Sequence, residues 1–126
     1  NECKKEKTIT DQDKKVVESI IKQARDAKKD IDNYGVDLNS PIKIFEAVGC
    51  DKCNKTGYSG RIGIFEAVKN DLDIQAIIPE NPSEHQIKQI ACHQGTLNMK
   101  EDGVIKILKG ITSLEEVGSV VDLLEE

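Results

Sequence analysis

The sequence lacks tryptophan, and its two tyrosines and two phenylalanines make up only 3% of its 126 residues. Its core must therefore be aliphatic. Basic patches interleaved with stacking aromatics are also missing, and a formal net charge of −5 is not typical of a nucleic-acid-binding protein. No apolar run approaches the roughly 20 residues that cross a bilayer, and no signal-peptide pattern opens the chain. We expect a soluble, cytoplasmic protein without direct membrane insertion.

The common nucleotide-binding and catalytic motifs are missing as well. The sequence has no G-x-x-x-x-G-K-[ST] phosphate loop, no G-x-G-x-x-G after a predicted strand, no H-E-x-x-H and no nucleophile elbow. This chain by itself is therefore predicted not to be an enzyme.

Cysteine is the residue type that carries chemistry here, with four copies in the chain. A reducing compartment favours metal or redox chemistry over two disulfides. Cys50 and Cys53 form a Cys-x-x-Cys pair followed by the turn-forming run "NKTGYSG", which suits a zinc knuckle. A thioredoxin-type redox pair belongs at the start of a helix, whereas glycines and a predicted strand follow here. Metal binding is favoured, and a redox Cys-x-x-Cys protein or a zinc-knuckle, chaperone-like adaptor are the alternatives.

A structural zinc site needs four ligands, and Cys3 is the predicted third. The fourth is left open by counting alone. A cysteine directly before Asn1 would complete a second Cys-x-x-Cys pair with Cys3. Cys92, His85 and His93 compete for the fourth place, although none has a spacing that requires a metal.

The first part of the chain, residues 1–69, is predicted to be a zinc-knuckle subdomain with an inserted helix at about residues 10–30. Thr10 is the expected N-cap of this helix, with Asp13 three residues on. The pentapeptide "IFEAV" occurs in residues 44–48 and again in residues 64–68, on either side of the Cys-x-x-Cys turn. Both copies are rich in branched and apolar residues, so we expect two strands that form a hairpin-like unit.

The second part, residues 70–126, is predicted to be a compact bundle of short helices. Asn70 or Asp71, Ser83 and Thr112 are the expected N-caps, and Gly95 is an expected C-terminal stop. The predicted fold class is therefore α+β, with a small zinc-knuckle β-hairpin unit followed by a compact bundle of short α-helices.

Two stretches carry a family likeness that covers residues 48–121. The run "VGCDKCNKTGYSGRIGIFEAV" resembles V-G-C-x-x-C-x-x-T-G-Y-x-G-R-x-G-I-[FY]-E, found near the C-terminus of type II secretion and type IV pilus assembly ATPases. The run "ACHQGTLNMKEDGVIKILKGITSLEEV" is similar to that family's ending, with Thr96, Met99 and Gly118 as mild departures. "NECK" at the start resembles the second half of an earlier Cys-x-x-Cys-Lys in the family.

The resemblance implies that Cys3, Cys50 and Cys53 are three of four zinc thiolates, the fourth being a cysteine directly before Asn1. The zinc would be structural, and this fragment with three cysteine ligands would bind it weakly or not at all. The chain would be the non-catalytic C-terminal region of a homohexameric ATPase whose ATP and magnesium site lies upstream. The parent would act with an inner-membrane platform protein, in the cytoplasm and peripheral to the inner membrane. The residues implied to shape the turn after the knuckle are Tyr58, Gly60 and Arg61.

Overall fold

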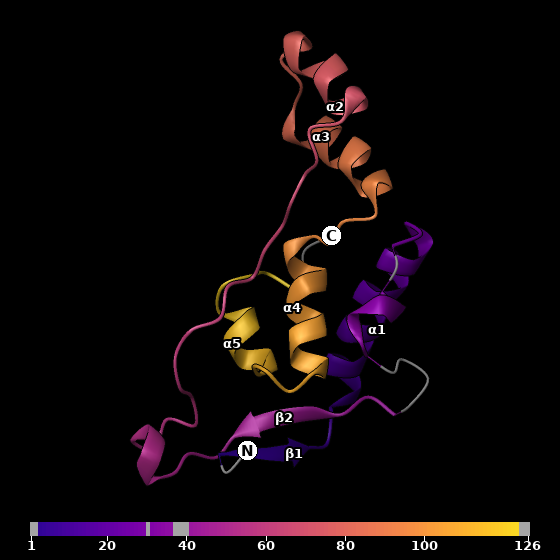
Figure 1. Cartoon of the computed structure of the whole chain (residues 1–126). Coiled ribbons are helices and arrows are strands. Elements are labelled where there is room, and N and C mark those ends of the chain that lie inside the picture. The colour runs from indigo at the N-terminus through magenta and orange to yellow at the C-terminus, as the bar shows by residue number, and fades with distance from the viewer. Residues whose placement is uncertain (1–2, 30, 37–40, 124–126) are drawn as a thin grey trace.

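The computed structural model describes residues 3–29, 31–36 and 41–123 (Figure 1). Its strands are β1 (Lys4–Lys7) and β2 (Ile44–Ala47), and its helices are α1 (Asp11–Asp26), α2 (Leu72–Ile77), α3 (Glu84–Ala91), α4 (Met99–Leu108) and α5 (Leu114–Gly118). The predicted α+β class is confirmed. Among the described residues, no helix is both long and apolar enough to cross a membrane.

The two strands form an antiparallel pair with Lys4 opposite Ala47 and Lys7 opposite Ile44. Helix α1 lies between them in the sequence, so the predicted insertion of a helix is confirmed. The partner expected for β2 is wrong, because residues 61–70 contain no strand. β1 pairs with the first "IFEAV" copy instead, and the backbone N–H of Phe65 in the second copy is bound by a side chain, the carboxylate of Asp102.

Helix α1 begins where the sequence predicts. The hydroxyl of Thr10 accepts a hydrogen bond from the backbone N–H of Asp13 at 3.2 Å, which satisfies one of the unpaired donors of the first turn. Val17, Ile20 and Ala24 are buried along one face. That face packs against α4, beside which α1 lies in Figure 1.

The later helices begin at local caps. Asp71 caps α2 and Ser83 caps α3, as expected. The expected cap Thr112 is wrong by one residue, because the hydroxyl of Ser113 accepts the N–H of Glu116 and α5 begins at Leu114. Ser113 is buried and is also hydrogen-bonded to the hydroxyl of Tyr58, 2.7 Å away.

Helix α4 occupies the centre of the core. Three groups of buried side chains form around it, one with β2 and α5 and two with α1. The groups are Ile44 with Ile107, Val117 and Val121; Val17 and Ile20 with Val104; and Ala24 and Ile31 with Leu97 and Ile105. Helices α2 and α3 pack on each other beyond the end of α4 (Figure 1). The core thus joins residues on both sides of position 69, and the division into subdomains 1–69 and 70–126 stays a prediction.

Candidate metal centre

The sheet brings the three predicted ligands to one end of the molecule. Cys3 directly precedes β1, and its carbonyl accepts the N–H of Val48, just after β2, at 2.9 Å. Cys50 and Cys53 follow two and five residues later: Cys50 directly precedes the short 3₁₀ turn Asp51–Cys53, and Cys53 is its last residue. Pairing of the two strands therefore places Cys3 beside the Cys-x-x-Cys turn, although Cys3 and Cys50 are 47 positions apart in the sequence.

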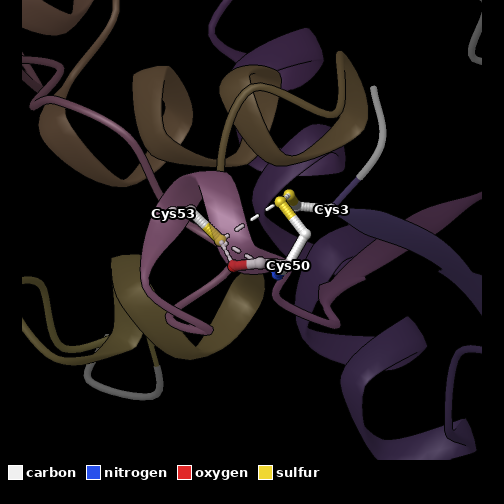
Figure 2. Close-up of side chains that lie close together, drawn as sticks. All are labelled: Cys3, Cys50 and Cys53. Carbon is white, nitrogen blue, oxygen red and sulfur yellow. Dashed lines mark hydrogen bonds between the residues drawn. The ribbon is translucent and has the colours of Figure 1, made fainter.

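The three sulfurs converge, as Figure 2 shows. The Sγ of Cys3 lies 2.6 Å from that of Cys50 and 3.6 Å from that of Cys53, and all three sulfurs lie within 4.8 Å of one another. Zinc–sulfur bonds of about 2.3 Å place tetrahedral sulfur ligands about 3.8 Å apart. The Cys3–Cys53 distance is close to that value, and the Cys3–Cys50 distance is about 1 Å shorter than it. The cluster has the donor type that zinc prefers and could hold a metal ion, and ligation of zinc by these three residues stays a prediction.

The backbone polarises one of the thiols. The Sγ of Cys53 accepts hydrogen bonds from the N–H groups of Cys50 and Gly57, each at 3.1 Å. Chiefly because of the Cys50 N–H, and against the opposing effect of burial, the pKa of Cys53 falls to about 6. The lowered pKa favours the thiolate of Cys53, the form in which cysteine binds metals. The pKa of Cys3 is raised to about 12, chiefly by a hydrogen bond with Cys50 and to a smaller extent by burial.

The turn that carries Cys50 and Cys53 requires glycine at two positions. Gly49 and Gly57 have φ values of 79° and 80°, a region that disfavours residues with a Cβ. A Cβ at Gly57 would lie 2.4 Å from the Cβ of Ala47, and one at Gly49 would lie 2.4 Å from the carbonyl oxygen of Lys55. This turn, residues 49–57 and called the knuckle below, is thus folded tightly against the end of β2.

Tyr58, Gly60 and Arg61 follow Cys53 in the sequence, and their role in shaping the turn stays a prediction. Gly60 has a φ of 74°, and Arg61 is exposed. The Tyr58 hydroxyl lies 2.7 Å from the hydroxyl of Ser113, the N-cap of α5. Sequence reasoning missed Ser113, because no local signal relates two residues 55 positions apart.

The competing fourth ligands lie elsewhere. His85 is in α3, and Cys92 and His93 follow it in the next turn. The thiol of Cys92 donates to the carbonyl of Gln89 at 2.9 Å. Within residues 3–29, 31–36 and 41–123, the structure adds none of these three side chains to the cysteine cluster.

Fold and site together define a small α+β chain with a three-cysteine centre at one end of its sheet, and comparison with known proteins gives it a family. The family described as "Type II/IV secretion system protein" matches residues 5–119. The chain is 42% identical over 87 residues to the type IV pilus assembly ATPase TfpB of Acinetobacter baylyi, which covers 69% of this chain and 15% of that protein.

Two further relatives give the same result. The type IV pilus assembly ATPase PilB of Pseudomonas aeruginosa is 40% identical over 89 residues, 71% of this chain and 16% of its own length. Type II secretion system protein E of Aeromonas hydrophila is 40% identical over 83 residues, 66% of this chain and 16% of its own length. The chain therefore belongs to the type II/IV secretion system protein family, as its motifs predicted. It spans about one sixth of the length of the relatives that it matches.

Proposed function

We propose that this chain is a zinc-stabilised, non-catalytic region of a longer secretion or pilus assembly ATPase. The convergence of three cysteine sulfurs from the ends of both strands is the observation that carries the proposal. Membership of the family and the names of the relatives support the ATPase context. ATP and magnesium would bind in another part of the parent protein.

The proposed role of the metal is structural. Zinc held by Cys3, Cys50 and Cys53 would fasten the start of β1 to the turn after β2, and a cysteine directly before Asn1 would supply the fourth thiolate. Four thiolates leave no open position for substrate or water. The hydrogen bond between Tyr58 and Ser113 would then connect the fastened knuckle to α5.

In the parent, this region would brace the subunits of a homohexamer. We place that hexamer in the cytoplasm, peripheral to the inner membrane, where a platform protein would receive the motion that extends a pilus or pseudopilus. The names of the relatives, which include both pilus assembly ATPases and type II secretion proteins, favour this general role without selecting between the two systems.

Metal content of the full-length protein tests the proposal. We expect one zinc per chain by elemental mass spectrometry after purification without chelators. Cys53→Ser should lose most of this zinc, whereas Cys92→Ser, a matched change outside the cluster, should keep it. Finding no zinc in the wild type, or an equal loss in both variants, would contradict the proposal.

A thiol–disulfide function is the second candidate, and the 2.6 Å distance between the sulfurs of Cys3 and Cys50 is the observation that favours it. The two functions differ in the state of the cysteines, which would bind zinc in the first and form a reversible disulfide in the second. Zinc-free protein that forms a reversible disulfide among these cysteines, with a reproducible midpoint in a glutathione buffer series, would support the redox function. Protein that retains zinc and shows no such midpoint would support the structural site.

A further inference from the structure

The loop between α4 and α5, residues 109–113, lies against the sheet (Figure 1). The carbonyl of Gly110 accepts a hydrogen bond from the Nζ of Lys4 at 3.1 Å, and Lys4 directly follows Cys3. The same Nζ lies 4.6 Å from the centroid of the Phe45 ring, and a Cβ at Gly110 would lie 2.8 Å from that ring. The start of the loop is therefore packed closely on both strands.

The end of the loop is held by the residue that follows the knuckle. The hydroxyl of Tyr58 lies 2.7 Å from the hydroxyl of Ser113, whose residue is only 3% exposed. Ser113 also accepts the backbone N–H of Glu116 and so caps α5. A serine hydroxyl has one hydrogen and two lone pairs, so it can make both contacts at once. Displacement of Tyr58 would therefore remove a partner from the buried cap of α5.

Tyr58 is in turn connected to Cys53 by short-range hydrogen bonds. The hydroxyl of Thr56 accepts the backbone N–H of Tyr58 at 3.3 Å and donates to the carbonyl of Cys53 at 2.7 Å. Between them, the N–H of Gly57 donates to the Sγ of Cys53 at 3.1 Å. A metal that fixes the Cys53 sulfur would therefore also fix the backbone that carries Tyr58.

A cavity of about 190 Å³ separates much of the loop from the cysteine cluster, and Cys3, Tyr58, Gly110 and Ser113 are among the residues that line it. Side chains on the two sides of a cavity do not touch, so they transmit little by packing. The loop meets the two cysteine-bearing segments where Lys4 and Tyr58 bond to it. The strand ladder already holds Lys4, which leaves Tyr58 as the contact that depends more on the metal.

We propose that metal binding at the cysteine cluster and the packing of α5 are coupled through Tyr58, so that the state of the cluster regulates α5. This inference rests on the proposed function in one respect, that the cluster binds zinc. With zinc bound, the knuckle keeps the Tyr58 hydroxyl at Ser113. Without zinc, the knuckle gains freedom, the hydrogen bond opens more often and α5 is held less firmly against the core, where its Val117 is 1% exposed.

Amide hydrogen exchange of the full-length protein, followed by mass spectrometry with and without zinc, tests the coupling. The reporters are the amides of Val117 and Ser119, which bond to backbone carbonyls one helical turn earlier. Removal of zinc with a chelator should speed their exchange about fivefold or more in the wild type. In Tyr58→Phe, which removes only the hydroxyl, the change should be less than about twofold. The amide of Ile20 in α1 should be unaffected, which checks that the metal-free protein is folded.

Tyr34→Phe is the matched control, and zinc affinity is a second readout. Tyr34 is the other tyrosine of the chain and is 39% exposed, against 38% for Tyr58, but it lies in the 3₁₀ turn after α1. Coupling between two sites is reciprocal. In competition with a chromophoric chelator, Tyr58→Phe should therefore bind zinc about fivefold more weakly than the wild type, whereas Tyr34→Phe should match the wild type in both measurements.

Three results would overturn the inference. Equal exchange of the α5 amides with and without zinc in the wild type would show that the two sites are not coupled. The same zinc dependence in Tyr58→Phe would show that the coupling does not run through Tyr58. Exchange of Ile20 that rises as much as that of α5 would show that zinc stabilises the whole chain instead. Zinc content is measured first: protein without zinc contradicts the proposed function together with this inference, whereas zinc-bearing protein with any of the three results contradicts this inference alone.

Discussion

The buried ion pair between Lys29 and Glu101 gives the sharpest prediction about how the inserted helix is attached. The Nζ of Lys29 lies 2.9 and 2.7 Å from the two carboxylate oxygens of Glu101, and each side chain is only 5% exposed. The carboxylate also accepts the backbone N–H of Asn98 at 2.7 Å as part of the capping box of α4. The pair thus joins the chain just after α1 to the first turn of α4.

The perturbation is Lys29→Met, which keeps most of the unbranched side chain and removes the charge. Glu101 would remain in a buried site without its cation. Breaking a buried pair in this way costs about 3–5 kcal/mol, a large part of a total stability of about 5–15 kcal/mol. The double variant Lys29→Met/Glu101→Gln also removes the buried negative charge while keeping an oxygen for Asn98. It should therefore be more stable than Lys29→Met alone, with a coupling free energy of at least about 1 kcal/mol.

Urea unfolding at pH 7 in reducing buffer, followed by circular dichroism, measures these differences in the free energy of unfolding. Lys22→Met is the control, because Lys22 is an exposed lysine of α1 and its change should stay within about 0.5 kcal/mol. The reasoning is refuted if Lys29→Met lies within about 1 kcal/mol of the wild type. It is also refuted if the double variant is destabilised by the sum of the effects of Lys29→Met and of Glu101→Gln, each measured alone.

Two further predictions concern the knuckle and the pH dependence of stability. Gly57→Ala should destabilise the protein by more than Gly60→Ala in the same urea assay, because both positions have positive φ but only Gly57 has a neighbouring Cβ 2.4 Å from the new methyl; equal effects would contradict the packing argument. A hydrogen bond from Lys7 holds the pKa of Glu115 below its ordinary value. The ion pair therefore stabilises the fold at pH values above the unfolded-state pKa of about 4.3. This stabilisation is lost as the pH falls through the lower pKa of Glu115 in the folded state. Lys7→Ala should cost up to about 0.5 kcal/mol at pH 7, since the pair is partly exposed, and the difference from the wild type should disappear in acid; a difference that persists there would exclude this ion pair as its cause.

Local signals in the sequence were sufficient for the helices. The caps at Thr10 and Ser83 were predicted because a capping hydrogen bond joins residues only three positions apart. The shift from Thr112 to Ser113 could not be predicted, since the contact that accompanies it comes from Tyr58. Whether a cap is chosen can therefore depend on a residue from another part of the fold.

Strand pairing was harder to predict than strand composition. The two "IFEAV" copies have the same composition, yet only the first pairs with a described strand. This pairing was hard to predict, because α1 separates β1 from β2 in the sequence and no spacing rule identifies β1 as the partner. The second copy is extended but held by Asp102 and Gln94. Composition indicates that a segment is suited to a sheet, and the neighbour is decided by the rest of the fold.

The candidate site was predictable to the extent that cysteine spacing is informative. Cys50 and Cys53 were identified from their spacing and the turn behind them, and Cys3 from the number of ligands that zinc requires. The structure brings these three together, and their role as ligands stays a prediction. The lowered pKa of Cys53 depends on the direction of the backbone N–H groups of Cys50 and Gly57.

The central claim is that the cysteine cluster belongs to a closed, structural zinc site. Its most direct test is the absorption spectrum of the full-length protein produced with cobalt in place of zinc, because Co²⁺ reports the geometry and the ligand type of the site that it occupies. The account predicts the intense visible bands of tetrahedral cobalt with thiolate charge transfer in the near ultraviolet, both weakened in Cys53→Ser and unchanged when small anions are added. Weak bands of six-coordinate cobalt, or a spectrum that is the same in wild type and Cys53→Ser, would contradict it.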